Sequence, residues 1–151
     1  FKNMSKIPYL IALVVSFSFI SCENDITTSQ VPSIVENTFK SKFAQAKNVE
    51  WEFANDTYEV SFEVENIDHD ALLDSSGNLL KYKHRIDGTA VPKEIRAFLA
   101  KEHPKGKWDD AEYVVDGNSK YFQIELDGFF TDTKLVVDSN GKELPNSKYW
   151  N

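Results

Sequence analysis

The sequence predicts an α+β fold of two tandem repeats, each a helix followed by about four antiparallel strands, which can join into one continuous sheet with the helices on one face. Two observations carry this prediction. The segment that begins at Val31 recurs from Val91 at an offset of 60, and the turn at residues 74–77 recurs at residues 138–141 at an offset of 64. Within each copy the apolar period also changes from helical to two, which is typical of a helix followed by strands.

We place the first repeat at residues 31–86 and the second at residues 91–150. Each opens with a helix, because Pro32 and Pro92 fit a first helical turn, where the missing N–H costs nothing. Apolar side chains then recur every fourth residue and predict a stripe that covers the sheet. These residues are Val35, Phe39 and Phe43 in the first copy, and Ile95, Leu99 and His103 in the second. Pro104 is expected to stop the second helix.

After each helix the sequence alternates between apolar and polar residues. Trp51 stands between two glutamates, and residues 58–65 alternate in the same way, which predicts antiparallel strands with one apolar face. Residues 71–73 and 80–86 complete the sheet of the first copy. Asn55–Asp56 predicts a tight turn, and the glycines of the two repeated turns, Gly77 and Gly141, are suited to a positive φ.

The first 21 residues are expected to be a secretory signal peptide. Two lysines precede an uncharged run at residues 7–21, which is too short for a spanning helix of roughly 20 residues. The only cysteine, Cys22, follows at once in the sequence Phe-Ile-Ser-Cys, which resembles the lipobox of bacterial lipoproteins. The resemblance implies lipidation of Cys22; the alternative is a buried cysteine that packs as a small apolar side chain.

Lipidation at Cys22 would anchor the chain to a membrane through acyl chains alone, and residues 22–30 would form a polar tether. The expected location is the cell envelope, facing the periplasm, with the outer membrane preferred over the inner and surface exposure left open.

The 151-residue chain has a formal net charge of -7, so it lacks the surplus of Lys and Arg that binds nucleic acid. One cysteine excludes an internal disulfide and a thiolate zinc cluster.

The sequence resembles the PepSY-like family of bacterial periplasmic proteins, also described as β-lactamase-inhibitor-like in fold. The similarity rests on the Val-Pro start, the helix, the segments around Trp51 and Phe62 and the Asp-x-x-Gly turn, all repeated behind a lipoprotein signal. It covers residues 31–144. The resemblance implies two tandem modules without catalytic residues. The second copy departs at Ala111, which takes the position of Trp51, while Trp108 lies three residues earlier.

No residue pattern predicts a cofactor or a metal site. The three histidines lack a metal-ligand spacing, and His69 between Asp68 and Asp70 is interpreted as a solvated strand entry or loop in preference to a site. Residues 116–119 and 138–141 resemble fragments of a calcium loop but lack its closing glutamate, so both are expected to be hairpin turns. HExxH, CxxC, GxSxG, P-loop and GxGxxG motifs are absent from the sequence.

The polar face of the predicted sheet is the candidate partner-binding surface. Its candidate residues are Glu50, Glu52, Glu59, Glu63, Gln123, Glu125 and Trp150. As an acidic platform they would dock a basic partner. The alternative is a solvated face whose acids pair across strands with the cations of residues 81–85. Tyr149 and Trp150 are expected either to anchor a partner or to close the last strand against the core.

The sequence therefore favours a noncatalytic, lipid-anchored binding module of the cell envelope, with an inhibitor as one form of it. The expected partner is a protein of unknown identity. Two alternatives stay open. One is an enzyme whose site uses unremarkable residues such as His69 with its flanking aspartates, and the other is a purely architectural protein of the envelope.

Overall fold

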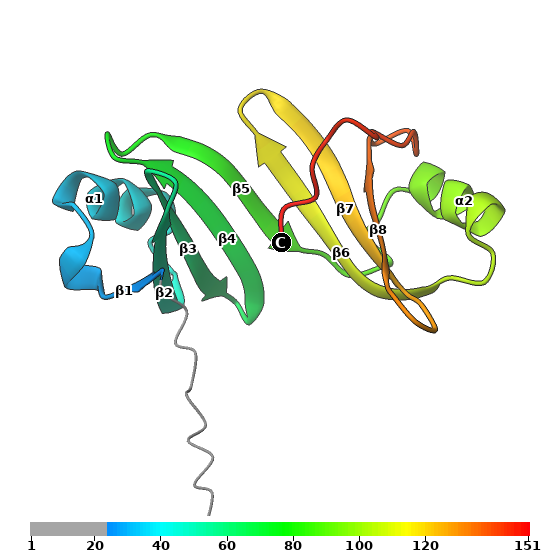
Figure 1. Cartoon of the computed structure of the whole chain (residues 1–151), viewed down its shortest axis with the longest axis horizontal. Helices are drawn as coiled ribbons and strands as arrows, with labels where there is room; N and C mark the ends of the chain where they lie inside the picture. The colour runs from blue at the N-terminus through cyan, green and yellow to red at the C-terminus, as the bar shows by residue number, and fades with distance from the viewer. Residues whose placement is uncertain (1–23) are drawn as a thin grey trace, which may run out of the picture.

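The computed structural model describes residues 24–151, so the predicted signal peptide and Cys22 lie outside the described residues. The described chain forms an eight-stranded antiparallel sheet in which the strand order, β1 to β8, is the chain order (Figure 1). The elements are β1 (Asp25–Ile26), a 3-10 turn η1 (Thr28–Gln30), α1 (Ser33–Lys42), β2 (Lys47–Ala54), β3 (Thr57–Val64), β4 (Ile67–Asp74), β5 (Leu79–Arg85), α2 (Lys93–Glu102), β6 (Lys107–Asp116), β7 (Ser119–Asp127) and β8 (Thr133–Val137).

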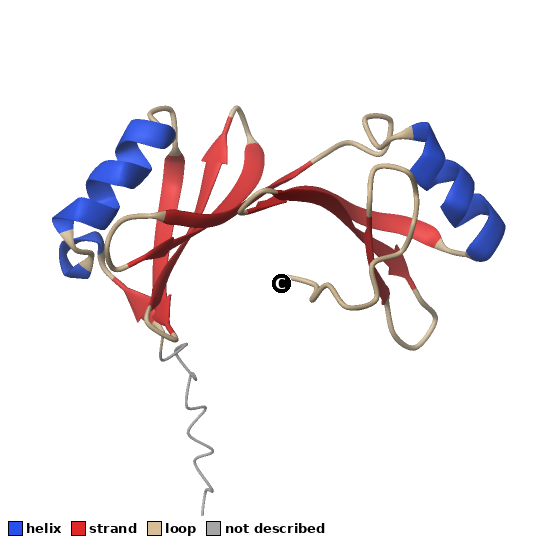
Figure 2. Ribbon diagram, turned by 90° about the horizontal axis from the view of Figure 1, so that it is seen from above, coloured by secondary structure: helices blue, strands red, loops and turns tan. Residues whose placement is uncertain are grey.

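The sheet is arched, and both helices lie on its outer side. Figure 2 shows α1 and α2 at opposite ends of the arch, while the segment that leads to residue 151 runs through the inside of the arch. We call the outer side the convex face and the inner side the concave face. The predicted α+β class, continuous sheet and common face for the helices are confirmed.

The first repeat has its own core between α1 and β2–β5. Val35 and Phe39 on the helix are buried against Trp51, Val60 and other apolar residues of the convex face. The ring of Phe39 meets the ring of Trp51 edge-on at 5.2 Å between centroids, an arrangement that aromatic pairs prefer. The predicted stripe is therefore the buried face of the helix.

The second repeat repeats this packing between α2 and β6–β8. Ile95 and Leu99 are buried against Ala111, Ile124 and other apolar residues of the same face. The small side chain of Ala111 occupies the position of Trp51, because Trp51 pairs with Val60 and Ala111 pairs with Ile124 in the equivalent strands. The second core thus fills its space with more aliphatic side chains.

The repeated Asp-x-x-Gly turns follow β4 and β8, and each packs against the start of the helix of its own repeat. Gly77 and Gly141 have φ values of +80° and +77°, as the sequence predicted. A Cβ at Gly77 would lie 2.9 Å from the carbonyl oxygen of Ile34, and one at Gly141 would lie 2.6 Å from that of Glu94. Only glycine allows each turn to contact the second residue of its helix so closely.

Two parts of the chain differ from the expected arrangement. The expected tether at residues 22–30 is folded from residue 25 onward, because Ile26 pairs with Trp51 and packs on the first core. The second copy has three strands where about four were expected. Where the fourth strand of the second copy was expected, the chain forms only an isolated bridge between Val137 and Glu143, since Pro145 has no N–H for a strand ladder.

The junction of the repeats is an ordinary strand pair. β5 and β6 pair in register from Lys81 with Asp116 to Arg85 with Glu112, so the sheet passes from one repeat to the next without a break. Neither helix of the described chain is long and apolar enough to cross a membrane.

Candidate partner-binding face of the sheet

The concave face is defined by the strand register. Residues that pair across antiparallel strands point to the same side, and side chains alternate between sides along each strand. One row crosses the sheet through Glu50, Ser61, Asp70, Lys83, Val114 and Tyr121. The neighbouring row runs through Arg85, Glu112, Gln123 and Val136. The face is polar on the side of the first repeat and partly apolar on the side of the second.

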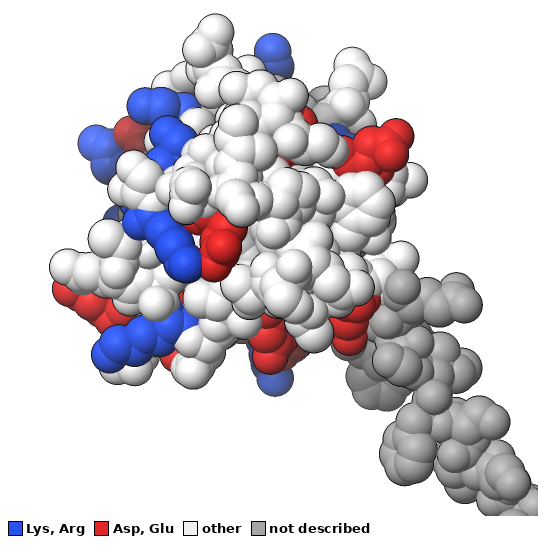
Figure 3. Space-filling view, turned by 90° about the vertical axis from the view of Figure 1, so that its left-hand side faces the viewer, with Lys and Arg blue, Asp and Glu red and all other residues white. Residues whose placement is uncertain are grey.

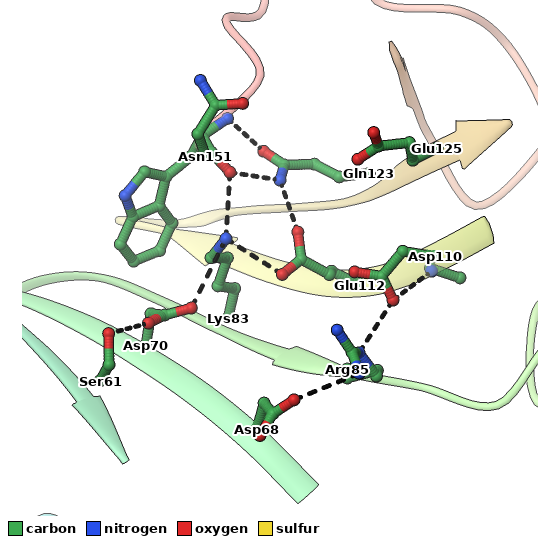
Figure 4. A network of polar contacts seen from close by, with 12 residues as sticks. Ser61, Asp68, Asp70, Lys83, Arg85, Asp110, Glu112, Gln123, Glu125 and Asn151 are labelled. Atoms are coloured by element: carbon green, nitrogen blue, oxygen red, sulfur yellow. Dashed lines mark hydrogen bonds and ion pairs between the residues drawn. The ribbon is translucent and has the colours of Figure 1, made fainter. Parts of the chain in front are cut away.

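Three cations on β5 form the centre of this face, and each is paired with acids of the neighbouring strands. Figure 4 shows the pairs of Lys83 and Arg85. Arg85 lies 3.2 Å from Asp68 on β4 and 3.0 Å from Asp110 on β6. Lys81 lies 3.2 Å from Asp116 on β6. The acids and cations thus pair across strands, as the alternative interpretation of a charge-paired face expected.

Lys83 is the most enclosed of these cations. It is 5% exposed, and its Nζ lies 3.0 Å from Glu112 and 3.5 Å from Asp70, which also accepts a hydrogen bond from the Ser61 hydroxyl. Beside it, the amide of Gln123 is fully buried and donates to Glu112 at 2.9 Å. Buried charges persist in proteins when they are paired and hydrogen-bonded, and this cluster meets that condition.

Residues 144–151, which we call the cover segment, account for the burial of this cluster. Leu144, Tyr149 and Trp150 pack on Val114, Tyr121 and Val136, an apolar group on the concave face that is separate from both helix-covered cores. The segment contains no strand after the bridge at Glu143. Its main-chain N–H at Leu144 donates to the carbonyl oxygen of Val136 on β8 at 2.7 Å, and beyond that bond the segment is held by side chains of the sheet.

Trp150 makes the central contacts of the cover segment. Its main-chain N–H donates to Oε1 of Gln123 at 2.7 Å, and its carbonyl oxygen accepts from Nε2 of Gln123 at 2.8 Å and from Nζ of Lys83 at 3.1 Å. Its indole N–H donates to Glu59 at 3.0 Å. The indole ring lies near two ammonium groups, with Lys81 and Lys83 at 5.3 and 5.1 Å from its centroid.

The cover segment changes the acid–base properties of groups that it touches. Burial raises the pKa of Glu59 above its ordinary value, although the hydrogen bond from the Trp150 indole opposes part of that rise. Burial and the nearby carboxylates of Glu112, Glu125 and Asp110 raise the pKa of Tyr149. Both effects follow from an enclosed, acid-rich surface beneath the segment.

The seven candidate residues share the concave face but not one environment. Glu50 and Glu52 are exposed on β2, and Glu63 is partly exposed and accepts a hydrogen bond from Asn48. Of the others, Trp150 belongs to the cover segment, and Glu59, Gln123 and Glu125 contact that segment or lie beside it. Among the candidate acids of the first repeat, Glu50 and Glu52 are thus exposed, whereas Glu59 is bonded to the cover segment.

The possible catalytic group around His69 does not form. His69 lies within β4, not at its entry, and its ring faces the convex side, where it stacks on Phe62 and contacts the Tyr82 hydroxyl at 2.8 Å through Nδ1. Asp68 and Asp70 point to the opposite face because side chains alternate along a strand. Among residues 24–151, no three His, Cys, Asp or Glu side chains gather as metal ligands.

The three tryptophans lie apart. Trp51 belongs to the first core, Trp150 to the cover segment, and Trp108 is 41% exposed beside an open hollow of about 890 Å³ at the junction of the repeats. Two further aromatic residues, Phe129 and Phe130, are exposed in the β7–β8 connection.

At the end of the molecule that carries α1, charges of both signs are dispersed over a largely uncharged surface (Figure 3).

Sequence reasoning missed Glu112 and the burial of Lys83. Alternation along β5 and β6 gives the face of each side chain, but it does not tell which positions a distant segment will cover. The signal was present in Tyr149–Trp150, the aromatic pair at the end of the second repeat, for which partner anchoring and closure of the last strand against the core were both open. In this structure the pair closes the concave face, across both repeats.

Comparison with known proteins agrees with this description. A family described as “Putative beta-lactamase-inhibitor-like, PepSY-like” matches residues 19–81 and 74–144, one match for each repeat. The chain belongs to this PepSY-like family. A search of curated proteins found no match.

Solved structures of similar fold come from Bacteroides species. One, described as “putative periplasmic proteins” from Bacteroides eggerthii, has a TM-score of 0.71 at 14% identity over 76% of this chain and 86% of that one. A DUF2874 family protein from Bacteroides uniformis has a TM-score of 0.69 at 16% identity over 75% and 86%. A BLIP-like protein from Bacteroides fragilis has a TM-score of 0.66 at 14% identity over 79% and 92%. At these identities the likeness concerns the fold alone.

Proposed function

We propose that this protein is a noncatalytic module of the cell envelope that binds a protein partner on its concave face and acts as an inhibitor or sequestering protein. The observation that carries the proposal is the position of both helices on the convex face. Among residues 24–151 this leaves a continuous sheet surface covered only by the cover segment. An arched sheet of this width offers a partner a shaped surface with charged and aromatic side chains on it.

Two further facts support the proposal. The family description is inhibitor-like, which favours binding over catalysis, although a shared fold alone does not establish a shared function. The one candidate catalytic group of the sequence, around His69, is divided between the two faces of β4.

Location in the envelope is the second part of the proposal. It is supported by the signal-like residues 1–21 and the lipobox-like sequence that ends at Cys22. The description of the Bacteroides eggerthii structure as periplasmic agrees with it. Because β1 begins at Asp25, a lipid on Cys22 would hold the edge of the sheet within a few residues of the bilayer, about 3.5 Å per residue at most.

Site-specific photo-crosslinking in intact cells tests the partner surface. A photoreactive amino acid in place of Glu50, which is exposed on the concave face, is expected to give a discrete protein adduct. The matched control is the same amino acid in place of Asn37, which is exposed on α1. Reversal of the nearby charge by Glu52→Lys is expected to reduce the adduct severalfold.

The proposal fails if Glu50 gives no adduct, or if the adducts from positions 50 and 37 are the same. The anchor is tested separately with an alkyne-labelled fatty acid. The unaltered chain is expected to take up the label and Cys22→Ser is expected to lose it; equal labelling of the two would contradict lipidation at this residue.

A further inference from the structure

The cover segment is bound to the sheet in the way that a peptide is bound to a receptor. Its residues 148–150 lie outside any strand, and the polar atoms of Trp150 are bonded to side chains of three strands: Glu59 of β3, Lys83 of β5 and Gln123 of β7. These strands belong to both repeats. The binding surface therefore exists only when the two repeats have formed one sheet.

The receptor side of this contact is built from buried groups. Gln123 is fully buried, and its amide meets both the N–H and the carbonyl oxygen of one residue, so it recognises main chain whatever the side chain. Its Nε2 also donates to Glu112, and Glu112 pairs with Lys83, so the three groups hold one another in position. Such a preorganised cluster reduces the ordering cost of binding.

Specificity for the side chain comes from other contacts. Glu59 accepts the indole N–H, and the ammonium groups of Lys81 and Lys83 lie near the indole ring at distances suited to cation–π attraction. Phenylalanine lacks the N–H, and an aliphatic residue lacks the ring. These contacts use both the N–H and the ring of the indole, which phenylalanine and aliphatic residues do not both supply.

We propose that the concave face carries a peptide-binding site for an extended segment that contains tryptophan, and that the chain fills this site with its own Trp150 until a partner segment displaces it. The inference rests on the proposed function and names what the concave face recognises. The tethered segment competes at an effective concentration on the order of 1 mM. For an intrinsic Kd of about 0.1 mM, occupancy in cis weakens the apparent affinity roughly tenfold.

The test uses the full chain with Trp150→Ala, which vacates the indole position, and a capped synthetic peptide of residues 144–151, Leu-Pro-Asn-Ser-Lys-Tyr-Trp-Asn. Isothermal titration calorimetry is expected to show binding to Trp150→Ala up to about tenfold tighter than to the unaltered chain. The same peptide with alanine in place of tryptophan is the ligand control. Circular dichroism verifies the fold of each variant.

A pair of double variants tests the receptor residues. Gln123→Ala added to Trp150→Ala is expected to abolish peptide binding, because the main-chain contacts are lost. Glu102→Ala in the same background removes an exposed carboxylate at the end of α2, outside the concave face, and is expected to leave binding unchanged. If Trp150→Ala is unfolded without ligand, the expected result is that the peptide restores the folded spectrum and the alanine peptide does not.

The inference is overturned if the peptide neither binds nor refolds Trp150→Ala, if the unaltered chain binds it equally well, or if Gln123→Ala has no effect. If the unaltered chain forms a dimer and Trp150→Ala does not, the site binds Trp150 of a second copy of this chain. That result would overturn the proposal that a segment of a different protein occupies it. If no peptide binding is observed but the photo-crosslinked adduct at position 50 still forms, this inference is refuted and the proposed function is not. Peptide binding without any adduct refutes the proposed function alone.

Discussion

Trp51 and Trp108 show how much the surroundings of one residue type differ within this chain. Trp51 is 3% exposed and packs against Phe39, whereas Trp108 is 41% exposed at the start of β6. Trp51→Ala is expected to reduce the free energy of unfolding by about 3–5 kcal/mol, because it leaves a cavity in the first core. Trp108→Ala is expected to cost less than about 1 kcal/mol. Urea denaturation of both variants measures the difference, and equal losses would contradict the assignment of the core.

His69 is expected to make stability depend on pH. Burial lowers its pKa below the ordinary value, and the neighbouring His84 lowers it further. Since the unfolded chain then binds the proton more readily, the stabilisation is complete above the unfolded pKa of about 6.5 and is lost as the pH falls through the folded pKa. Between pH 8 and 5 the free energy of unfolding should therefore fall less in His69→Phe than in the unaltered chain. Denaturation at a series of pH values measures this dependence. If the free energy of unfolding changes with pH equally in the two proteins, His69 is excluded as a source of the pH dependence.

Gln123 marks the limit of sequence prediction for single residues. The alternation of β7 places it on the polar face, beside Glu125, and the sequence offers no reason to separate the two. Its complete burial results from Trp150, which is 27 residues away in the chain. Alternation of apolar and polar residues indicates on which face of the sheet a side chain lies. Whether that side chain is exposed depends on contacts with segments distant in the sequence.

The repeated turns are the elements whose position is most strictly defined. Gly77→Ala and Gly141→Ala each add a Cβ at a positive φ and against a helix carbonyl, so each is expected to cost about 1–3 kcal/mol of stability. Gly88 has nothing within 4 Å of the added Cβ and is the matched control, with an expected change within about 0.5 kcal/mol. Thermal denaturation of the three variants compares them; a Gly88→Ala loss as large as the others would contradict the close approach.

Elements were predictable where local periodicity and turn residues agree. Val35 and Phe39 indicated the buried side of α1, and Asn55–Asp56 has the predicted tight turn with φ values of 52° and 62°. The strand at Asp25–Ile26 was not predictable, because a two-residue strand has no period and forms only by pairing with β2. The missing fourth strand of the second copy follows from Pro145, whose effect appears only after the register is known.

The two repeats are expected to unfold together. They have separate helix-covered cores, but β5 and β6 pair along their length, and the cover segment joins Glu59 of the first repeat to Gln123 of the second. Native-state hydrogen exchange compares Val60 and Ile124, fully buried residues at equivalent positions of the repeats. The expected opening free energies agree within about 1 kcal/mol. A value for one repeat that is several kcal/mol lower would show independent unfolding.

The strand order of the whole sheet has a consequence for how the chain acquires its structure. Each strand pairs with the one synthesised immediately before it: most ladders close a short connection, and the β1–β2 and β5–β6 ladders each span one α-helix. The chain can therefore build the sheet from its first strand onward as it is synthesised. Residues 144–151 are the exception, since their docking position requires β3, β5 and β7 together. The cover segment can therefore dock only after the sheet has formed completely. Before it docks, the concave face is accessible to other chains.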